Sequence, residues 1–291
     1  MSFLNNVITG ISLGSIYAII ALGYTMVYGI AKMLNFAHGD IIMVGAYMAF
    51  FAMGRGIPGV VGVLLAIAVC TVLGVVIERL AYKPLRQAPS LAVLITAIGV
   101  SYLLQNGAQI LWGAETKIFT PIVDGVLVLV PNQLSISYVA ILSVACCIVV
   151  MVGLTLFTSR TRMGKAMRAC SEDKAAAQLM GINVDATISM TFAIGSALAA
   201  VAGVLMCSAY PILSPTTGSL PGIRAFTAAV FGGIGSVPGA LLGGILLGII
   251  ETFGKAYIST DLSDAVVFAV LIIVLLVKPA GLMGKYVPEK V

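Results

Sequence analysis

Charged residues divide this chain into long apolar runs. Stretches without any charged residue cover positions 1–31, 56–77, 87–114, 125–159, 186–223 and 225–250. Each run can hold a helix of about 20 residues, which is long enough to cross roughly 30 Å of hydrocarbon. The runs are uniformly apolar rather than alternating, and every backbone amide inside a bilayer needs an internal partner. The pattern therefore predicts an all-α polytopic membrane protein.

The runs predict where several helices cross. We expect spans near positions 57–78, 91–112, 134–158 and 186–209. The first run lacks a basic segment and an evident cleavage site, and more spans follow it, so we interpret it as a mature span rather than a signal peptide. In total we expect eight or nine crossings in a single transmembrane domain over residues 1–291.

Two places interrupt the apolar pattern. The first reads LNFAHGD at 34–40, and the second reads GGIGSVPG at 232–239. The second divides two apolar stretches of about a dozen residues, each too short to span alone, so we expect tilting, extension or a re-entrant hairpin buried by protein. Such breaks often line the pathway of transporters, although Gly and Pro are also generally frequent in membrane helices. Small residues at Gly239, Gly243, Gly244 and Gly248 predict a close approach of another helix.

Composition and charge fit a membrane protein with a defined orientation. Of 291 residues, 60% are hydrophobic and 9% are charged, against about 45–50% and about 25% in soluble domains. Eleven of the 16 Lys and Arg residues lie in 79–86, in 160–174 and from Lys278 onward. Basic residues favour the cytosolic side, which places loops 79–90 and 159–185 and the C-terminus in the cytosol and loop 113–133 outside. The net charge of +5 thus reflects topology, and we expect no nucleic acid partner.

Enzyme chemistry is not indicated by the residues. The chain has one histidine, no clustered carboxylates, and five cysteines without metal-ligand spacing. It has no GxxxxGK followed by Ser or Thr, so any ATP would be hydrolysed by a separate chain. We expect no catalytic residue, metal or cofactor.

Five polar residues lie in or beside apolar runs and are candidates for lining a translocation path: Asn35, His38, Asp40, Gln105 and Asn106. For the first three, the favoured interpretation is a helix start at which Asn35 or Asp40 caps free amides, since Asp40 would repel a substrate carboxylate. The alternative is that they face the path near a half-helix. Gln105 and Asn106 are expected to form interhelical hydrogen bonds.

The loop at 159–185 is the longest polar segment. Met163, Met167 and Cys170 form an apolar stripe at i, i+4 and i+7, and Gly181 is expected to end the helix. The other faces carry Arg162, Lys165, Arg168, Glu172 and Asp173. The pattern predicts a short cytosolic amphipathic helix, which fits equally a protein partner or the surface of anionic membrane lipid.

Part of this loop resembles a known motif. Residues 168–182 read RACSEDKAAAQLMGI, which is similar to the EAA motif of permeases of ATP-binding-cassette (ABC) importers, in the form found in branched-chain amino acid permeases. Ala175, Ala176, Ala177 and Gly181 align with Glu-Ala-Ala and the Gly four residues later. Ala175 stands where the motif has Glu, which puts in doubt any salt bridge from that position.

The resemblance extends over nearly the whole chain. The segments at 10–47, 78–86, 232–251 and 278–285 also look like blocks of that family, and LNFAHGD is the most specific. The resemblance implies a helical permease bundle in a bacterial inner membrane, paired with a second homologous permease, cytosolic ABC ATPases and an extracytoplasmic binding protein. It also implies that 159–185 is the coupling loop. The residues expected to contact the ATPase are Arg162, Met163, Met167, Arg168, Glu172, Ala175, Ala176, Ala177 and Gly181.

The function implied by this resemblance is ATP-driven import of leucine, isoleucine and valine. Related branches of the family handle urea or short amides, so those substrates are the alternative. A stand-alone secondary transporter is disfavoured because Asp40 is the one plausible acid inside the membrane. A membrane scaffold would leave both broken segments unexplained.

Overall fold

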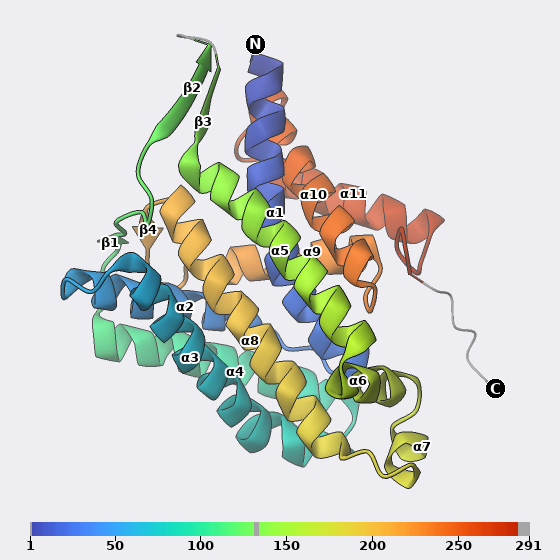
Figure 1. Cartoon of the computed structure of the whole chain (residues 1–291). Coiled ribbons are helices and arrows are strands. Elements are labelled where there is room, and N and C mark those ends of the chain that lie inside the picture. Colours follow the sequence, from blue (N-terminus) through green and yellow to red (C-terminus); the bar gives the residue numbers. More distant parts are fainter. Residues whose placement is uncertain (1, 131–133, 285–291) are drawn as a thin grey trace.

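The computed structural model describes residues 2–130 and 134–284 (Figure 1). The first half contains α1 (Ser2–Ala31), α2 (His38–Gly54), α3 (Gly59–Ile77), the π-helix η1 (Glu78–Tyr82), the 3-10 helix η2 (Lys83–Leu85), α4 (Ser90–Trp112), β1 (Lys117–Ile118), β2 (Val126–Val130) and β3 (Leu134–Ser137). The second half contains α5 (Tyr138–Arg160), α6 (Arg162–Glu172), α7 (Lys174–Leu179), α8 (Val184–Ala209), β4 (Ile212–Leu213), α9 (Ser219–Gly232), α10 (Val237–Tyr257) and α11 (Ser263–Val277).

The all-α membrane fold predicted from the apolar runs is confirmed. Within the described residues, six helices are long and apolar enough to cross a membrane, namely α1, α3, α4, α5, α8 and α10, while α2 and α11 are shorter apolar helices. The predicted spans at 57–78, 91–112 and 186–209 agree with α3, α4 and α8 to within two residues. The expected total of eight or nine crossings stays a prediction.

The predicted span at 134–158 begins too early. Residues 134–137 form strand β3, which pairs with β2 in an antiparallel hairpin. Helix α5 starts only at Tyr138, because the Ser137 hydroxyl accepts a hydrogen bond from the Val139 amide (3.2 Å) and so caps the helix. The hairpin and the N-terminus of α1 lie at one end of the bundle, and α6 and α7 lie at the opposite end (Figure 1).

Helices α1 and α8 form the centre of the bundle. They are the most buried of the six candidate spans, whereas α3, α4 and α5 expose most of their surface. Helix α1 contacts α5, α6, α8, α9 and α10, and its most extensive contact is with α10. The exposed helices carry apolar side chains such as Val72, Leu103 and Val149 outward, as expected of surfaces that face lipid or another membrane subunit.

The contact between α1 and α10 is a glycine-mediated backbone approach. A Cβ atom on Gly248 would lie 2.3 Å from the Cα of Gly14, and one on Gly244 would lie 2.5 Å from the Cα of Ala18. A Cβ on Gly243 would instead meet the carbonyl oxygen of Ala228 on α9 at 2.2 Å. The close packing predicted for this glycine-rich helix is therefore confirmed, and it involves two partner helices rather than one.

Three breaks interrupt the helices. Residues 32–37 separate α1 from α2, and residues 233–236 separate α9 from α10, as the sequence predicts. In the second break Gly233 and Gly235 adopt φ values of +105° and +96°, which favour glycine. A third break at 214–218, between β4 and α9, was not predicted. Helix α9 has 14 residues, so by itself it is too short to cross a bilayer.

The α1–α10 contact leads to a stability prediction. Gly248→Leu should destabilise the protein by at least about 1–3 kcal/mol, because the new side chain overlaps the α1 backbone, which cannot move aside as a flexible side chain would. The measurement is thermal unfolding in detergent. Gly99→Leu on α4 is the matched control, because no atom lies within 4 Å of a Cβ at Gly99. Equal unfolding temperatures for the two variants would contradict the packing.

Candidate functional site

Helices α2 and α9 each follow a non-helical segment, and they meet at their N-terminal ends. Their N-terminal ends come into backbone contact: a Cβ on Gly39 would lie 2.6 Å from the carbonyl oxygen of Gly218, and one on Gly222 would lie 2.9 Å from the Cα of Gly39. Only residues without side chains allow this approach. Two short helices thus start at one junction inside the bundle, with the positive ends of their dipoles close together.

Asp40 occupies this junction. Its side chain is buried, with 1% exposed, and its Oδ1 accepts a hydrogen bond from the Gln105 amide nitrogen of α4 (2.9 Å). The same nitrogen lies 3.1 Å from the hydroxyl of Ser219 at the start of α9 and 3.2 Å from that of Ser101. Asp40 and Gln105 therefore connect α2, α4 and α9 through one polar cluster.

The capping interpretation of Asn35 and Asp40 is wrong. Ala37 occupies the N-cap position of α2, and no side chain caps the helix. Asn35 instead accepts a hydrogen bond from the Tyr82 hydroxyl in η1 (2.8 Å), while Asp40 bonds to Gln105. Both side chains make long-range contacts between segments rather than local contacts at the helix start, because the backbone folds as a turn at 36–37 before the helix.

His38 fills a notch between α1 and α8. A Cβ on Gly23 would lie 2.6 Å from its Nε2, and one on Gly195 would lie 3.8 Å from its Cε1. The ring also packs against Tyr24, with ring centroids 4.6 Å apart. Nε2 has no hydrogen-bond partner in the part of the chain that the structure describes. The imidazole thus acts as a packing group at the centre of the bundle.

The two candidates on α4 behave differently. Gln105 makes the expected interhelical hydrogen bonds, as described above. Asn106 does not, because its amide donates to the carbonyl oxygen of Tyr102 on the same helix (2.7 Å) and its side chain faces outward. The structure therefore brings Gln105 to Asp40, while Asn106 lies apart from the other candidates.

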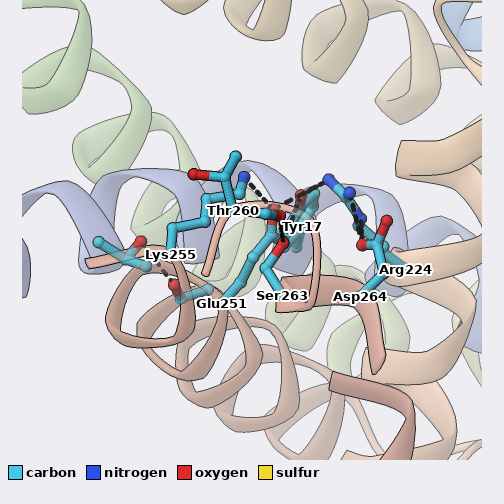
Figure 2. Close-up of polar contacts among 9 residues, drawn as sticks. Tyr17, Arg224, Glu251, Lys255, Thr260, Ser263 and Asp264 are labelled. Carbon is cyan, nitrogen blue, oxygen red and sulfur yellow. Dashed lines mark hydrogen bonds and ion pairs between the residues drawn. The ribbon is translucent and has the colours of Figure 1, made fainter. Parts of the chain in front are cut away.

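A buried ion network was missed by the sequence reasoning (Figure 2). Glu251 of α10 is fully buried, and its carboxylate contacts the Tyr17 hydroxyl (2.8 Å), Arg224 Nη1 (2.9 Å) and Lys255 Nζ (2.5 Å). Arg224 also pairs with Asp264 of α11 at 2.6 Å. The network joins α1, α9, α10 and α11, and its two acids and two bases balance in charge.

A second ion network lies at the end of the bundle near α6 and α7. Arg86 pairs with the fully buried Glu78 and with Asp185 at the start of α8. Lys83 also contacts Asp185 (2.7 Å), and the Ser189 hydroxyl donates to Glu78 (2.6 Å). The segment between α3 and α4 is thereby fixed to the first turns of α8.

The 159–185 loop forms two helices rather than one. Thr161 caps α6 by accepting from the Gly164 amide (2.9 Å), and Asp173 caps α7 by accepting from the amides of Ala175 and Ala176 (2.8 and 3.0 Å). The expectation of one helix was wrong because Asp173 can accept these bonds only by leaving the helical conformation. Gly181 follows the end of α7 at φ +82°, as predicted for a stop.

The faces of α6 and α7 are now defined. Met167 and Cys170 are buried against the bundle and Met163 is partly buried, which confirms the predicted apolar stripe. Burial raises the pKa of the Cys170 thiol. On α7, Ala177 is buried whereas Ala175 and Ala176 are exposed.

Two large apolar side chains at this end face outward. Leu179 is 88% exposed and Met180 is 83% exposed. Lys174, the first residue of α7, donates to the carbonyl oxygen of Ala31 at the end of α1 (2.6 Å). Its pKa is lowered by burial and by the neighbouring Arg86 and Lys32. The loop thus presents an apolar tip and is attached to the central helix.

These features define a class of protein: a multi-pass membrane permease with broken helices and a projecting helical loop. The chain belongs to the family described as branched-chain amino acid transport system / permease component, whose model matches residues 6–275.

Relatives cover almost the whole chain. The high-affinity branched-chain amino acid transport system permease protein BraD of Pseudomonas aeruginosa is 46% identical, over 99% of this chain and 98% of its own length. LivH of Escherichia coli, of the same description, is 44% identical with the same coverage. A probable branched-chain amino acid permease of Methanocaldococcus jannaschii is 30% identical over 93% of this chain and 89% of its own.

The ion network around Glu251 leads to a prediction for stability. Arg224→Met should cost about 3 kcal/mol of unfolding free energy, because it leaves the buried Glu251 carboxylate with fewer partners. The double variant Arg224→Met with Glu251→Gln should cost less than the sum of the two single changes. Unfolding in detergent measures both. Asp261→Asn, at an exposed position, is the control, and an Arg224→Met protein as stable as this control would refute the network's role.

Proposed function

We propose that this chain is the membrane-spanning permease subunit of an ATP-driven importer for leucine, isoleucine and valine. The observation that carries the proposal is the family membership, with near-complete coverage by high-affinity branched-chain amino acid permeases. The bundle of apolar helices with three breaks agrees with a translocating subunit. The partners follow from the same family: a second homologous permease, cytosolic ABC ATPases that hydrolyse ATP, and an extracytoplasmic binding protein.

The competing function is a secondary transporter that works alone. Such a protein needs a membrane acid that can exchange a proton or hold a cation. The structure adds Glu78 and Glu251 to Asp40 as buried acids. Glu78 is paired with Arg86, Glu251 is paired with Arg224 and Lys255, and Asp40 is bonded to Gln105. None of these carboxylates is free for exchange, which favours an external energy source. In vesicles containing the assembled complex and binding protein, leucine uptake should require ATP and persist without an ion gradient.

The ATPase is proposed to dock on the tip of the loop. We call the exposed side chains of Ala175, Ala176, Leu179 and Met180 the coupling face. On a helix these positions cluster within one side, because residues three and four apart are neighbours. Exposed apolar residues that project from the bundle into water are typical of protein interfaces. This face therefore replaces Ala177, which packs inward, as the part of the motif that meets the ATPase.

Attachment of the loop to α1 gives the docking a mechanical consequence. The hydrogen bond from Lys174 to the Ala31 carbonyl satisfies a backbone group that the end of α1 leaves open. Movement of the loop is therefore transmitted to the helix at the centre of the bundle. Three further residues predicted to contact the ATPase are exposed on α6, namely Arg162, Arg168 and Glu172.

The proposed orientation can be tested with thiol labelling. Ala114→Cys, in the loop between α4 and β2, should react with a membrane-impermeant reagent in intact cells, whereas Lys165→Cys on α6 should react only after the membrane is opened. Both positions are exposed, so burial does not explain a difference. Labelling of the α6 position from outside would show that the orientation is the reverse of the proposed one and that α6 and α7 do not face the cytosolic ATPase.

Docking of the ATPase on the coupling face can be tested by introducing one charged side chain there. Leu179→Asp should release the ATPase during purification and lower ATP-driven leucine uptake by roughly tenfold or more, because it places an unpaired charge in an apolar contact. Gln178→Asp adds the same charge on a neighbouring side of α7 and is the matched control. Copurification of the ATPase and uptake in vesicles are measured together. Retention of both by the Leu179 variant would show that the ATPase binds elsewhere.

A further inference from the structure

The N-terminal half of α1 and the last residues of α8 line an open cavity of about 340 Å³. The β2–β3 hairpin and the first turn of α5 complete its wall. This is the end of the bundle opposite α6 and α7 (Figure 1), which the distribution of basic residues places outside. The volume falls within the range of small-molecule binding sites, about 300–1,000 Å³.

The lining combines hydroxyl groups with aliphatic side chains. Hydroxyls come from Thr9, Ser12, Ser135, Ser137, Ser208 and Tyr210, and aliphatic surface comes from residues such as Ile8, Val126 and Ile136. The described lining contains no Asp, Glu, Lys, Arg or His. Six hydroxyl groups would not be expected in a cavity that holds lipid chains. Neutral polar groups beside an apolar wall instead match a small zwitterion with an aliphatic side chain.

Ser12 provides an independent sign of a ligand. Its side chain is 8% exposed and lies in the cavity wall. Its hydroxyl makes no hydrogen bond within the residues that the structure describes, although Ser15, one turn away, bonds to the Ile11 carbonyl (2.7 Å). The Ser12 hydroxyl oxygen is not enclosed by protein atoms, so it faces the space of the cavity. It can therefore form a hydrogen bond with a molecule in the cavity.

The wall also contains the start of a long helix. Ala140, in the first turn of the 23-residue helix α5, lines the cavity. The first turn of a helix carries amide groups without intrahelical partners and the positive end of the dipole, which favour a carboxylate. Two amides of this turn already have partners, because Tyr138 donates to the Gly125 carbonyl oxygen (3.1 Å) and Val139 donates to the Ser137 hydroxyl (3.2 Å). A carboxylate in the cavity would therefore meet the amide of Ala140.

We propose that this cavity is an outer subsite for an aliphatic α-amino acid, occupied when the binding protein delivers its cargo and before the substrate moves on through the permease. The carboxylate lies toward the first turn of α5 and the Ser12 hydroxyl, and the side chain lies against Ile8, Val126 and Ile136. This inference rests on the proposed function and adds the place where the substrate first meets the permease.

The first test is ligand protection of an introduced thiol. Ser12→Cys in the complete complex, reconstituted with its ATPase, second permease and binding protein, is treated with a cationic water-soluble thiol reagent. Leucine-loaded binding protein and ATP should slow the labelling severalfold. Glu115→Cys, exposed in the outer loop and outside the cavity, should label equally with and without leucine. Equal labelling of Ser12→Cys in both conditions, or labelling only by a lipid-soluble maleimide, overturns the subsite.

The second test fills the cavity. Ala140→Trp should lower leucine uptake by roughly tenfold or more in a complex that still assembles. Ala145→Trp, exposed on the same helix, should leave uptake near the wild-type rate. Uptake by the wild-type complex tests the proposed function separately. Full uptake by Ala140→Trp, in a complex that imports leucine, overturns the subsite alone.

Discussion

The backbone contact between α1 and α10 determines most of the arrangement around the centre of the bundle. Gly14, Gly244 and Gly248 allow the two helices to touch without side chains between them. Lipid chains are as apolar as the helices, so packing and hydrogen bonds, rather than the exclusion of water, hold such a pair together. The close approach also brings Tyr17 to Glu251 and so positions the network that includes Arg224 and Asp264. Without this contact, the buried Glu251 would lose a partner on α1.

The sequence predicts features that depend on local composition. Helix α4 was predicted to within one residue, because hydrophobic length and the bounding charges are properties of one segment. Residues 34–40 and 232–239 carry Gly, Pro and polar residues, which mark breaks directly. The break at 214–218 also carries such residues, with three Pro between 211 and 221, but it was missed because the expectation rested on charge-free runs and 186–223 contains no charge.

Features that depend on distant residues could not be predicted. Arg224, Glu251, Lys255 and Asp264 are isolated charges in the sequence, and only the packing of α9, α10 and α11 brings them together. Asp40 and His38 were recognised as unusual, but their partners lie far away along the chain, at Gln105 and in the notch formed by Gly23 and Gly195. A capping interpretation considers neighbouring residues alone and therefore failed. The inward orientation of Ala177 could not be predicted either, because it depends on how α7 packs against distant segments.

The Asp40 junction explains how broken helices are tolerated inside the bundle. Each helix start leaves backbone amides open, and the dipoles of α2 and α9 bring positive charge to the same place. A carboxylate at this position offsets that charge, and Gln105 joins it to α4. The same carboxylate repels an anionic group, so the carboxylate end of an amino acid is better held at the start of α5, where the cavity lining carries no charged side chain.

Helix α1 connects the two ends of the molecule. Ala31 at one end accepts the Lys174 hydrogen bond, and Ser12 lines the cavity, 19 residues earlier in the same helix. At 1.5 Å per residue these positions are roughly 28 Å apart, close to the thickness of the hydrocarbon core. Under the proposed docking, a pull on Ala31 would move α1 together with α10, to which the glycine contact ties it. Helix α1 contributes five residues to the cavity wall, so its displacement at the loop would change the width of the cavity directly.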